Sequence, residues 1–219
     1  MFPLKLEKLF LPLGIVAIGA IALYAYNSAI AAPLPKGFPA PTDEGRIEVK
    51  RYPAYRAATV RYTGDLSMAT FRAFDPLFRH INDNEISMTS PVETRYPIST
   101  LDPNNTNRNG EAWVSFLYRD TDTYPKEIAD NIEVEDIPPM TVVSLGLRGS
   151  YDYSSYQDNI KKLHNWLKQN PQYSVVGEPR RFFYDSPFIP EALKRSEIQI
   201  PIEEIEEIEE TEKTPETEP

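Results

Sequence analysis

Apolar and polar residues alternate along residues 47–62, the pattern of a strand that buries one of its faces. Beyond Gly64 the apolar residues recur every three or four positions, which predicts an amphipathic helix. The stripe that we expect to face the core consists of Phe71, Phe74, Phe78 and Ile81. Pro76 lies inside this helix, where a proline removes one backbone hydrogen bond, so the helix should bend or restart at that point. Segments 85–97 and 111–119 are predicted to be strands.

The second half of the chain repeats this plan. Residues 133–147 are strand-like, Gly149 supplies a turn, and segments 173–184 and 197–202 are predicted to close the sheet. The inner stripe of the second predicted helix consists of Tyr156, Ile160, Leu163 and Leu167. Similar residues recur at a constant separation of 85 positions, as in the pairs Ile47/Ile132, Pro53/Pro138 and Gly64/Gly149. The pattern indicates an α+β fold of two matching halves, with a barrel-like sheet and two outer helices, and the cleft between the halves is a candidate ligand site.

Residues 1–32 differ from the rest of the chain. Lys5 and Lys8 precede an uncharged, largely apolar stretch at residues 9–32, which is the charge order of a secretory leader or of a membrane anchor. The small residues of Ala29-Ile30-Ala31, namely Ala29 and Ala31, suit cleavage by a signal peptidase, whereas the length of the uncharged stretch suits an anchor that spans the bilayer. Both interpretations stay open, with the anchor slightly favoured. If the leader is cleaved, the domain is secreted or periplasmic. If it stays as an anchor, the domain is attached to the membrane on its non-cytoplasmic side.

Two further segments flank the predicted domain at residues 46–202. Four prolines within residues 33–45 predict a stiff, extended linker. Residues 203–219 hold nine Glu and one Lys, so they carry most of the chain's net charge of −10 and are predicted to form a disordered acidic tail. The sequence has no basic stripe interleaved with aromatic residues, which leaves nucleic-acid binding without support.

Several classes of chemistry lack the residues that they require. The absence of cysteine excludes disulfides, thiolate metal sites, catalytic thiols and covalent haem attachment through a Cys-x-x-Cys-His motif. Neither a Gly-x-Ser-x-Gly elbow nor a glycine-rich phosphate loop occurs, so we predict that the protein is not an enzyme. What remains is a domain rich in aromatic residues, with 13 Tyr, 10 Phe and 2 Trp in the chain, against which a flat apolar ligand can lie.

The two histidines, His80 and His164, flank the apolar stripes of the two predicted helices, so we expect both to be half-exposed. Neutral imidazole binds haem iron well, which makes each a candidate axial ligand, although a histidine at such a position is more often an ordinary surface residue. Arg72 and Arg79 lie along the outer side of the first helix, where they either pair with acidic groups on a ligand or are simply solvated.

Four segments resemble the SOUL/haem-binding protein family. They are the opening strand Glu48-Val49-Lys50-Arg51-Tyr52-Pro53, the helix pattern Phe74-x-x-Leu77-Phe78-x-x-Ile81, the strand Ile86-Ser87-Met88-Thr89-Ser90-Pro91-Val92, and the closing segment from Tyr184-Asp185-Ser186-Pro187 through Pro190, Leu193, Arg195 and Glu197. These segments follow one another in order between residues 46 and 202. The resemblance implies a pseudo-twofold duplicated βαββ unit that forms a distorted antiparallel barrel-like sheet with two outer helices.

The resemblance also implies reversible, non-covalent binding of haem or a related tetrapyrrole by a carrier, buffer or scavenger. In the family the ligand is thought to lie against the first helix. By position this points to Met68, Phe71, Arg72, Asp75, Arg79 and His80. The family does not agree on an axial ligand, so no motif assigns that role to His80 or His164. The alternative is an effector-sensing or scaffold module that binds an apolar small molecule or a protein partner in the cleft between the repeats, because the related fold also serves bacterial regulators.

Overall fold

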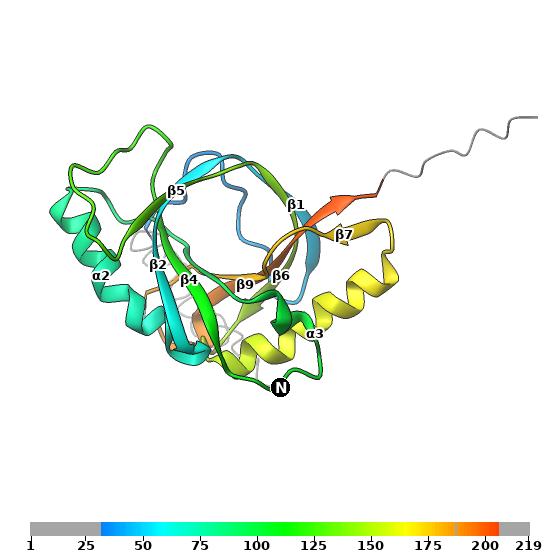
Figure 1. The fold of residues 1–219 in the computed structure, drawn as a ribbon. Helices are drawn as coiled ribbons and strands as arrows, with labels where there is room; N and C mark the ends of the chain where they lie inside the picture. Colours follow the sequence, from blue (N-terminus) through cyan, green and yellow to red (C-terminus); the bar gives the residue numbers. More distant parts are fainter. Residues whose placement is uncertain (1–31, 187, 206–219) are drawn as a thin grey trace, which may run out of the picture.

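The computed structural model describes residues 32–186 and 188–205, which form nine β-strands and two α-helices (Figure 1). Residues 1–31 of the predicted leader or anchor and residues 206–219 of the predicted tail lie outside the described residues. The strands are β1 (Ile47–Tyr52), β2 (Tyr55–Asp65), β3 (Val92–Arg95), β4 (Asn109–Leu117), β5 (Glu133–Ile137), β6 (Met140–Arg148), β7 (Tyr173–Val175), β8 (Arg180–Phe183) and β9 (Arg195–Glu204). The helices are α2 (Ala69–Asp83) and α3 (Tyr153–Gln169), with 3-10 turns η2 (Leu66–Met68), η3 (Ile98–Leu101) and η4 (Glu191–Leu193).

The strands form one antiparallel sheet in the order β1-β6-β9-β8-β3-β4-β2-β5, and β7 pairs with β9. The sheet curves strongly, and both helices lie outside it, as Figure 1 shows. The predicted α+β class with two outer helices is therefore confirmed. The prediction of a barrel-like sheet is only partly right, because β1 and β5 end the sheet and do not pair with each other, so the curved sheet is not closed into a barrel.

The two halves have similar but unequal orders of elements. Residues 47–117 give β1-β2-α2-β3-β4, whereas residues 133–204 give β5-β6-α3-β7-β8-β9. The second half has one strand more, and the pseudo-twofold duplication stays a prediction. Segment 85–97, predicted as one strand, contains only the four residues of β3 as strand. Pro91 directly precedes β3, and since proline has no N–H to donate, it is not expected to continue a hydrogen-bonded ladder.

Helix α3 faces the core with the predicted side. Tyr156, Ile160 and Leu163 are buried, and Leu167 packs partly buried against the same core. The helix starts where the Asp152 carboxylate accepts a hydrogen bond of 2.7 Å from the backbone N–H of Ser155, a typical N-cap. The second predicted stripe is thus confirmed.

Helix α2 faces the core with a different side from the one predicted, and only Ile81 belongs to both. Its buried side chains are Ala69, Ala73, Leu77, His80 and Ile81. Phe71, Phe74 and Phe78 are exposed, so the predicted stripe is wrong for three of its four members. Both sets of residues recur at helical spacing, but the alanines let the helix approach β2 and β4 closely, which three phenylalanine rings would prevent. The helix also continues through Pro76 instead of restarting there.

The segment at residues 33–45, which we expected to be a linker, packs against the inner face of the curved sheet (Figure 1). The Phe38 ring meets the rings of Tyr52 and Tyr55 edge-on, at centroid distances of 5.0 and 5.3 Å. Further along, Thr42 is buried and its backbone N–H donates to the Glu197 carboxylate. In the structure these residues are therefore part of the packed body.

Candidate functional site

A row of three exposed phenylalanines lies along the outer side of α2. Phe71 is 72% exposed, Phe78 49% and Phe74 38%. Phe74 and Phe78 stack with their ring centroids 6.0 Å apart, and Phe74 also meets the buried ring of Phe116 edge-on at 5.2 Å. Contiguous exposed apolar surface of this kind marks binding sites more often than isolated apolar residues do. We call Phe71, Phe74 and Phe78 the phenylalanine row.

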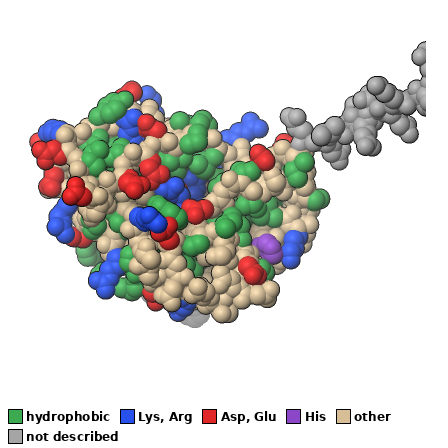
Figure 2. Space-filling view, viewed as in Figure 1, with side chains coloured by type: hydrophobic (Ala, Val, Ile, Leu, Met, Phe, Trp, Pro, Cys, Tyr) green, Lys and Arg blue, Asp and Glu red, His purple; other side chains and the backbone are tan. Residues whose placement is uncertain are grey.

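Two arginines stand beside the phenylalanine row on the exposed side of the same helix. Arg79 pairs with the Asp75 carboxylate one turn away, and this hydrogen-bonded pair raises the pKa of Arg79. Arg72 is also exposed, and it forms no ion pair with any residue that the structure describes. Figure 2 shows the same mixture of hydrophobic, basic and acidic side chains over the α2 side of the molecule. Arg72 is thus the cation next to the row that is available to an acidic ligand group.

His80 was predicted to be half-exposed, and that prediction is wrong. The side chain is only 5% exposed, and it faces the core side of α2 because Ala69 and Ala73 bring that side against the sheet. Its Nε2 shares a hydrogen bond of 2.7 Å with the Tyr118 hydroxyl, and its Nδ1 lies 3.4 Å from Asn84 Nδ2. Burial lowers the pKa of His80, which favours the neutral imidazole.

His164 lies on α3 and is half-buried, in line with the prediction for this residue. Its Nδ1 is buried and has no hydrogen-bond partner among the described residues. The two histidines therefore stand on different helices, and neither belongs to the phenylalanine row. Within the ranges 32–186 and 188–205 no group of three or more His, Cys, Asp or Glu residues is arranged to hold a metal ion.

The structure thus brings together most of the residues expected from the family. Phe71, Arg72, Asp75 and Arg79 lie on the exposed side of α2, and Met68 lies half-buried at its start. His80 is buried on the core side of α2, where it lines a cavity together with Arg79, but it does not belong to the phenylalanine row. Phe74 and Phe78 were assigned to the core and were missed as surface residues. The alanines at positions 69 and 73, one turn apart, were the signal that another side of the helix could pack.

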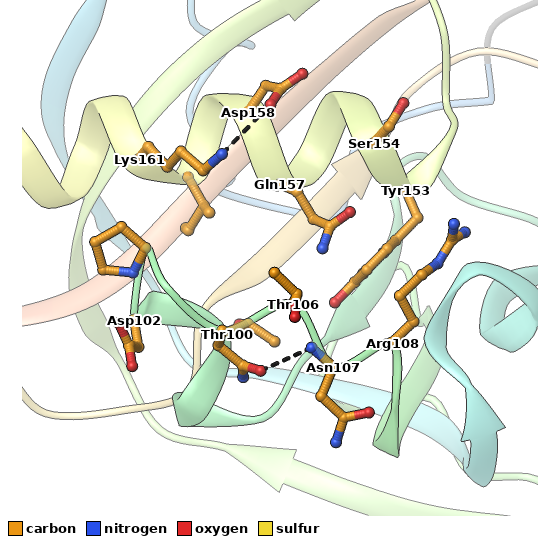
Figure 3. Close-up of a pocket in the computed structure, with 13 residues that line it drawn as sticks. Thr100, Asp102, Thr106, Asn107, Arg108, Tyr153, Ser154, Gln157, Asp158 and Lys161 are labelled. Carbon is orange, nitrogen blue, oxygen red and sulfur yellow. Dashed lines mark hydrogen bonds and ion pairs between the residues drawn. The ribbon is translucent and has the colours of Figure 1, made fainter.

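A cavity of about 290 Å³ lies between the loop that precedes β4 and helix α3 (Figure 3). Its labelled side chains are polar or aromatic. Arg108 lies over the Tyr153 ring, and Lys161 Nζ lies 3.6 Å from Asp158 Oδ1. Opposite charges line it in equal number, since Asp102 and Asp158 balance Arg108 and Lys161. Because charged side chains line this cavity, it suits a flat apolar ligand less well than the three exposed rings of the phenylalanine row do.

Comparisons with known proteins identify the family. The family model described as SOUL heme-binding protein matches residues 39–201. The chain belongs to this family. The match starts inside the segment that packs on the inner face of the sheet and covers both helices and every strand up to most of β9. A comparison with curated proteins finds no relative of this chain.

Solved structures show the same fold at low sequence identity. The C-terminal domain of EcmrR superposes with a TM-score of 0.60 at 19% identity, over 73% of this chain and 98% of that domain. A hydrolase from Listeria innocua superposes with a TM-score of 0.52 at 11% identity, over 74% of this chain and 94% of that one. At such identities the likeness establishes the fold and carries no information on the ligand.

Proposed function

We propose that this protein binds haem or a related tetrapyrrole without a covalent bond, as a carrier, buffer or scavenger, and that the ligand lies on the phenylalanine row of α2. Membership of the SOUL family supports the ligand class. The observation that carries the choice of surface is the exposure of Phe71, Phe74 and Phe78 on one side of α2. The proposal includes no bond-making or bond-breaking step.

The apolar contribution can be estimated from the exposed area. A phenylalanine side chain offers roughly 200 Å², so the exposed fractions of the three rings add up to roughly 300 Å². Covering all of that area would contribute about 8 kcal/mol at 25 cal/mol per Å², as an upper bound. Association itself costs several kcal/mol, so a flat ligand that covers the row is expected to bind at micromolar rather than nanomolar concentrations.

Arg72 would orient the ligand. A tetrapyrrole carries carboxylates at its rim, and an arginine pairs with carboxylates through two parallel hydrogen bonds. Arg72 has no ion pair among the described residues, whereas Arg79 must first release Asp75. An exposed pair of this kind contributes about 0.2–1 kcal/mol, so it mainly fixes orientation while the rings supply affinity.

Iron ligation by His80 does not agree with this geometry. The imidazole is buried on the core side of α2, and Tyr118 and Asn84 surround its nitrogens. The proposal therefore has the macrocycle held by apolar contact, with no axial bond from His80.

A hemin titration of the full chain, followed at the Soret band, tests this function. The wild type should bind saturably, and the Phe71→Ala/Phe78→Ala variant should bind at least tenfold more weakly. Phe188→Ala is the matched control, because Phe188 is 94% exposed but lies outside α2. Equal affinity in the wild type and the double variant, or no saturable binding at all, would refute the proposal.

We also propose that residues 1–32 attach the domain to a membrane or direct its export, so that the domain faces the non-cytoplasmic side. The order of Lys5, Lys8 and the uncharged stretch supports this proposal. Among the described residues, neither α2 nor α3 nor any other helix has the length and apolar character needed to cross a bilayer.

A further inference from the structure

A second cavity, of about 340 Å³, lies on the face of the sheet that points away from α2. The hydroxyl groups of Thr94 in β3 and Thr70 in α2 are hydrogen-bonded at 2.9 Å, so Thr94 faces the helix. Side chains alternate between the two faces of a strand, and the neighbours Glu93 and Arg95 therefore point to the opposite face. Both line this cavity.

The most deeply buried cation of the cavity wall is Arg180, which is 1% exposed. Its Nε donates to Gln199 Oε1 at 2.9 Å, and its Nη1 donates to the Tyr55 hydroxyl at 2.8 Å and to Glu93 Oε1 at 3.1 Å. Its Nη2 is buried and has no acceptor among the described residues. A buried donor without an acceptor is costly, so this wall is short of one hydrogen-bond acceptor.

Arg95 adds a second donor without an acceptor. Its Nη2 donates to both oxygens of the Glu135 carboxylate, at 2.9 and 3.0 Å, but its Nε is buried and unpartnered among the described residues. The same wall holds Glu178, which forms no ion pair with a described residue, and burial raises its pKa. The wall thus holds two guanidinium donors without an acceptor, which a ligand reaches only when these side chains shift, together with a carboxyl group that can accept a hydrogen bond.

Charge and shape narrow the class of ligand. The four ionisable side chains other than Tyr55 that line the cavity are Arg95, Arg180, Glu93 and Glu178, and their formal charges cancel, which favours an uncharged ligand over an ion. Apart from Tyr55, the rest of the wall is largely apolar and consists of Ile137, Pro138, Pro139, Met140, Val176, Gly177 and Pro201. The volume is at the lower end of the range for small-molecule sites, so the ligand is small.

We propose that this cavity binds a small uncharged molecule with an apolar body and a carboxamide group. After a shift of the guanidinium group that uncovers Arg180 Nη2 or Arg95 Nε, the carbonyl oxygen accepts a hydrogen bond from it, and the amide N–H donates to the Glu178 carboxyl group. The apolar body lies against Ile137, Met140 and Val176. The site is separate from the phenylalanine row, because the two lie on opposite faces of the sheet.

The test is a titration of the full chain with benzamide, benzoate and benzylamine, followed by chemical shifts of the backbone amides. The three probes share one ring and differ in charge and in hydrogen-bonding groups. Benzamide should bind saturably and shift resonances of the cavity residues, while benzoate and benzylamine should bind at least fivefold more weakly. No saturable shift with benzamide, or equal binding of a charged probe, would overturn the proposal.

Variants locate the binding. Val176→Trp places a bulky side chain at the cavity rim, where Val176 is 52% exposed, and it should weaken benzamide binding at least tenfold. Val175→Trp makes the same change one residue earlier, outside the cavity lining, and should leave affinity unchanged. Arg95→Lys keeps a cation for Glu135 but removes Nε, and should weaken binding severalfold. Equal affinity in Val176→Trp and wild type would place the probe elsewhere and overturn the proposal.

Discussion

Replacing Lys50 by methionine should destabilise the protein through the carboxylate that it leaves behind. Lys50 Nζ lies 2.8 Å from Glu197 Oε1, and the two side chains are 6% and 0% exposed. Glu197 also accepts hydrogen bonds from the Thr42 backbone and from the hydroxyl of Tyr184 at 2.9 Å. In Lys50→Met the carboxylate keeps those donors but loses its cation in a water-poor interior.

The expected loss is large. Breaking a buried ion pair by removing one partner costs about 3–5 kcal/mol, because the remaining charge is buried without compensation. At about 2–4 °C per kcal/mol for a folded body of this size, the melting temperature should fall by roughly 10 °C. Lys162→Met is the matched control, since Lys162 is exposed on α3 and has no ion pair among the described residues.

The pH dependence gives a sharper test of the same pair. Burial alone would raise the pKa of Glu197, but Lys50 and the hydrogen bonds from Thr42 hold it below its ordinary value. A lowered folded-state pKa contributes stability that is present above the unfolded pKa of about 4.3 and is lost as the pH falls through the folded value. In Lys50→Met burial is no longer opposed by the lysine, so the folded-state pKa of Glu197 should lie above the unfolded one. The variant therefore becomes more stable relative to the wild type as the pH falls.

Urea unfolding of the wild type, Lys50→Met and Lys162→Met at pH 7 and at pH 4 measures both effects. The difference in unfolding free energy between the wild type and Lys50→Met should be several kcal/mol at pH 7 and clearly smaller at pH 4. A difference below about 1 kcal/mol at pH 7, the value of an ordinary exposed pair, would refute the reasoning. So would a difference that is equal at the two pH values.

Three further predictions follow from the site and the ends of the chain. Arg72→Gln should weaken hemin binding about threefold, which corresponds to the loss of one exposed charge pair. Arg79→Gln should weaken it less, because Arg79 is already paired with Asp75. Equal losses of affinity in parallel Soret titrations of the two variants would contradict this prediction. His80→Ala should lower the free energy of unfolding in urea by about 1–3 kcal/mol, because the hydrogen bond to the Tyr118 hydroxyl is lost. The hemin affinity of this variant should stay within twofold of the wild type. A tenfold loss of affinity would place the iron near His80. The full chain should stay with membranes after alkaline carbonate extraction if residues 1–32 form an uncleaved anchor; release of the uncleaved chain into the supernatant would argue against an anchor.

Periodicity in the sequence predicted the elements well but did not fix which side of a helix packs. In α3 one apolar stripe exists, and Tyr156, Ile160 and Leu163 are buried as expected. In α2 two stripes share the same period, and size rather than hydrophobicity decided between them. The side with Ala69 and Ala73 lies against the sheet, so the larger phenylalanines remain outside.

The same reversal explains the error about His80. The position of His80 beside the predicted phenylalanine stripe suggested a half-exposed imidazole. Because α2 packs with its alanine side against the sheet, His80 instead lies on the core side and is hydrogen-bonded to Tyr118. The packing of residues 33–45 could not be predicted either, because it depends on Tyr52, Tyr55 and Glu197 meeting on the inner face of the sheet. Contacts between residues so far apart in the chain leave no periodic signal. The family motifs, by contrast, were sufficient to identify the family.

The central claim is that the tetrapyrrole lies on the phenylalanine row, and a tryptophan placed in that row tests it most directly. Phe71 is the most exposed ring of the row, and Phe71→Trp adds a fluorophore there in addition to the chain's two native tryptophans. Hemin quenches tryptophan fluorescence strongly at short range. The added fluorescence should be almost fully quenched at the hemin concentration that saturates the Soret change, while that of Phe188→Trp should be quenched much less. If hemin saturates the Soret change and leaves the added fluorescence of Phe71→Trp no more quenched than that of Phe188→Trp, the ligand does not lie on α2.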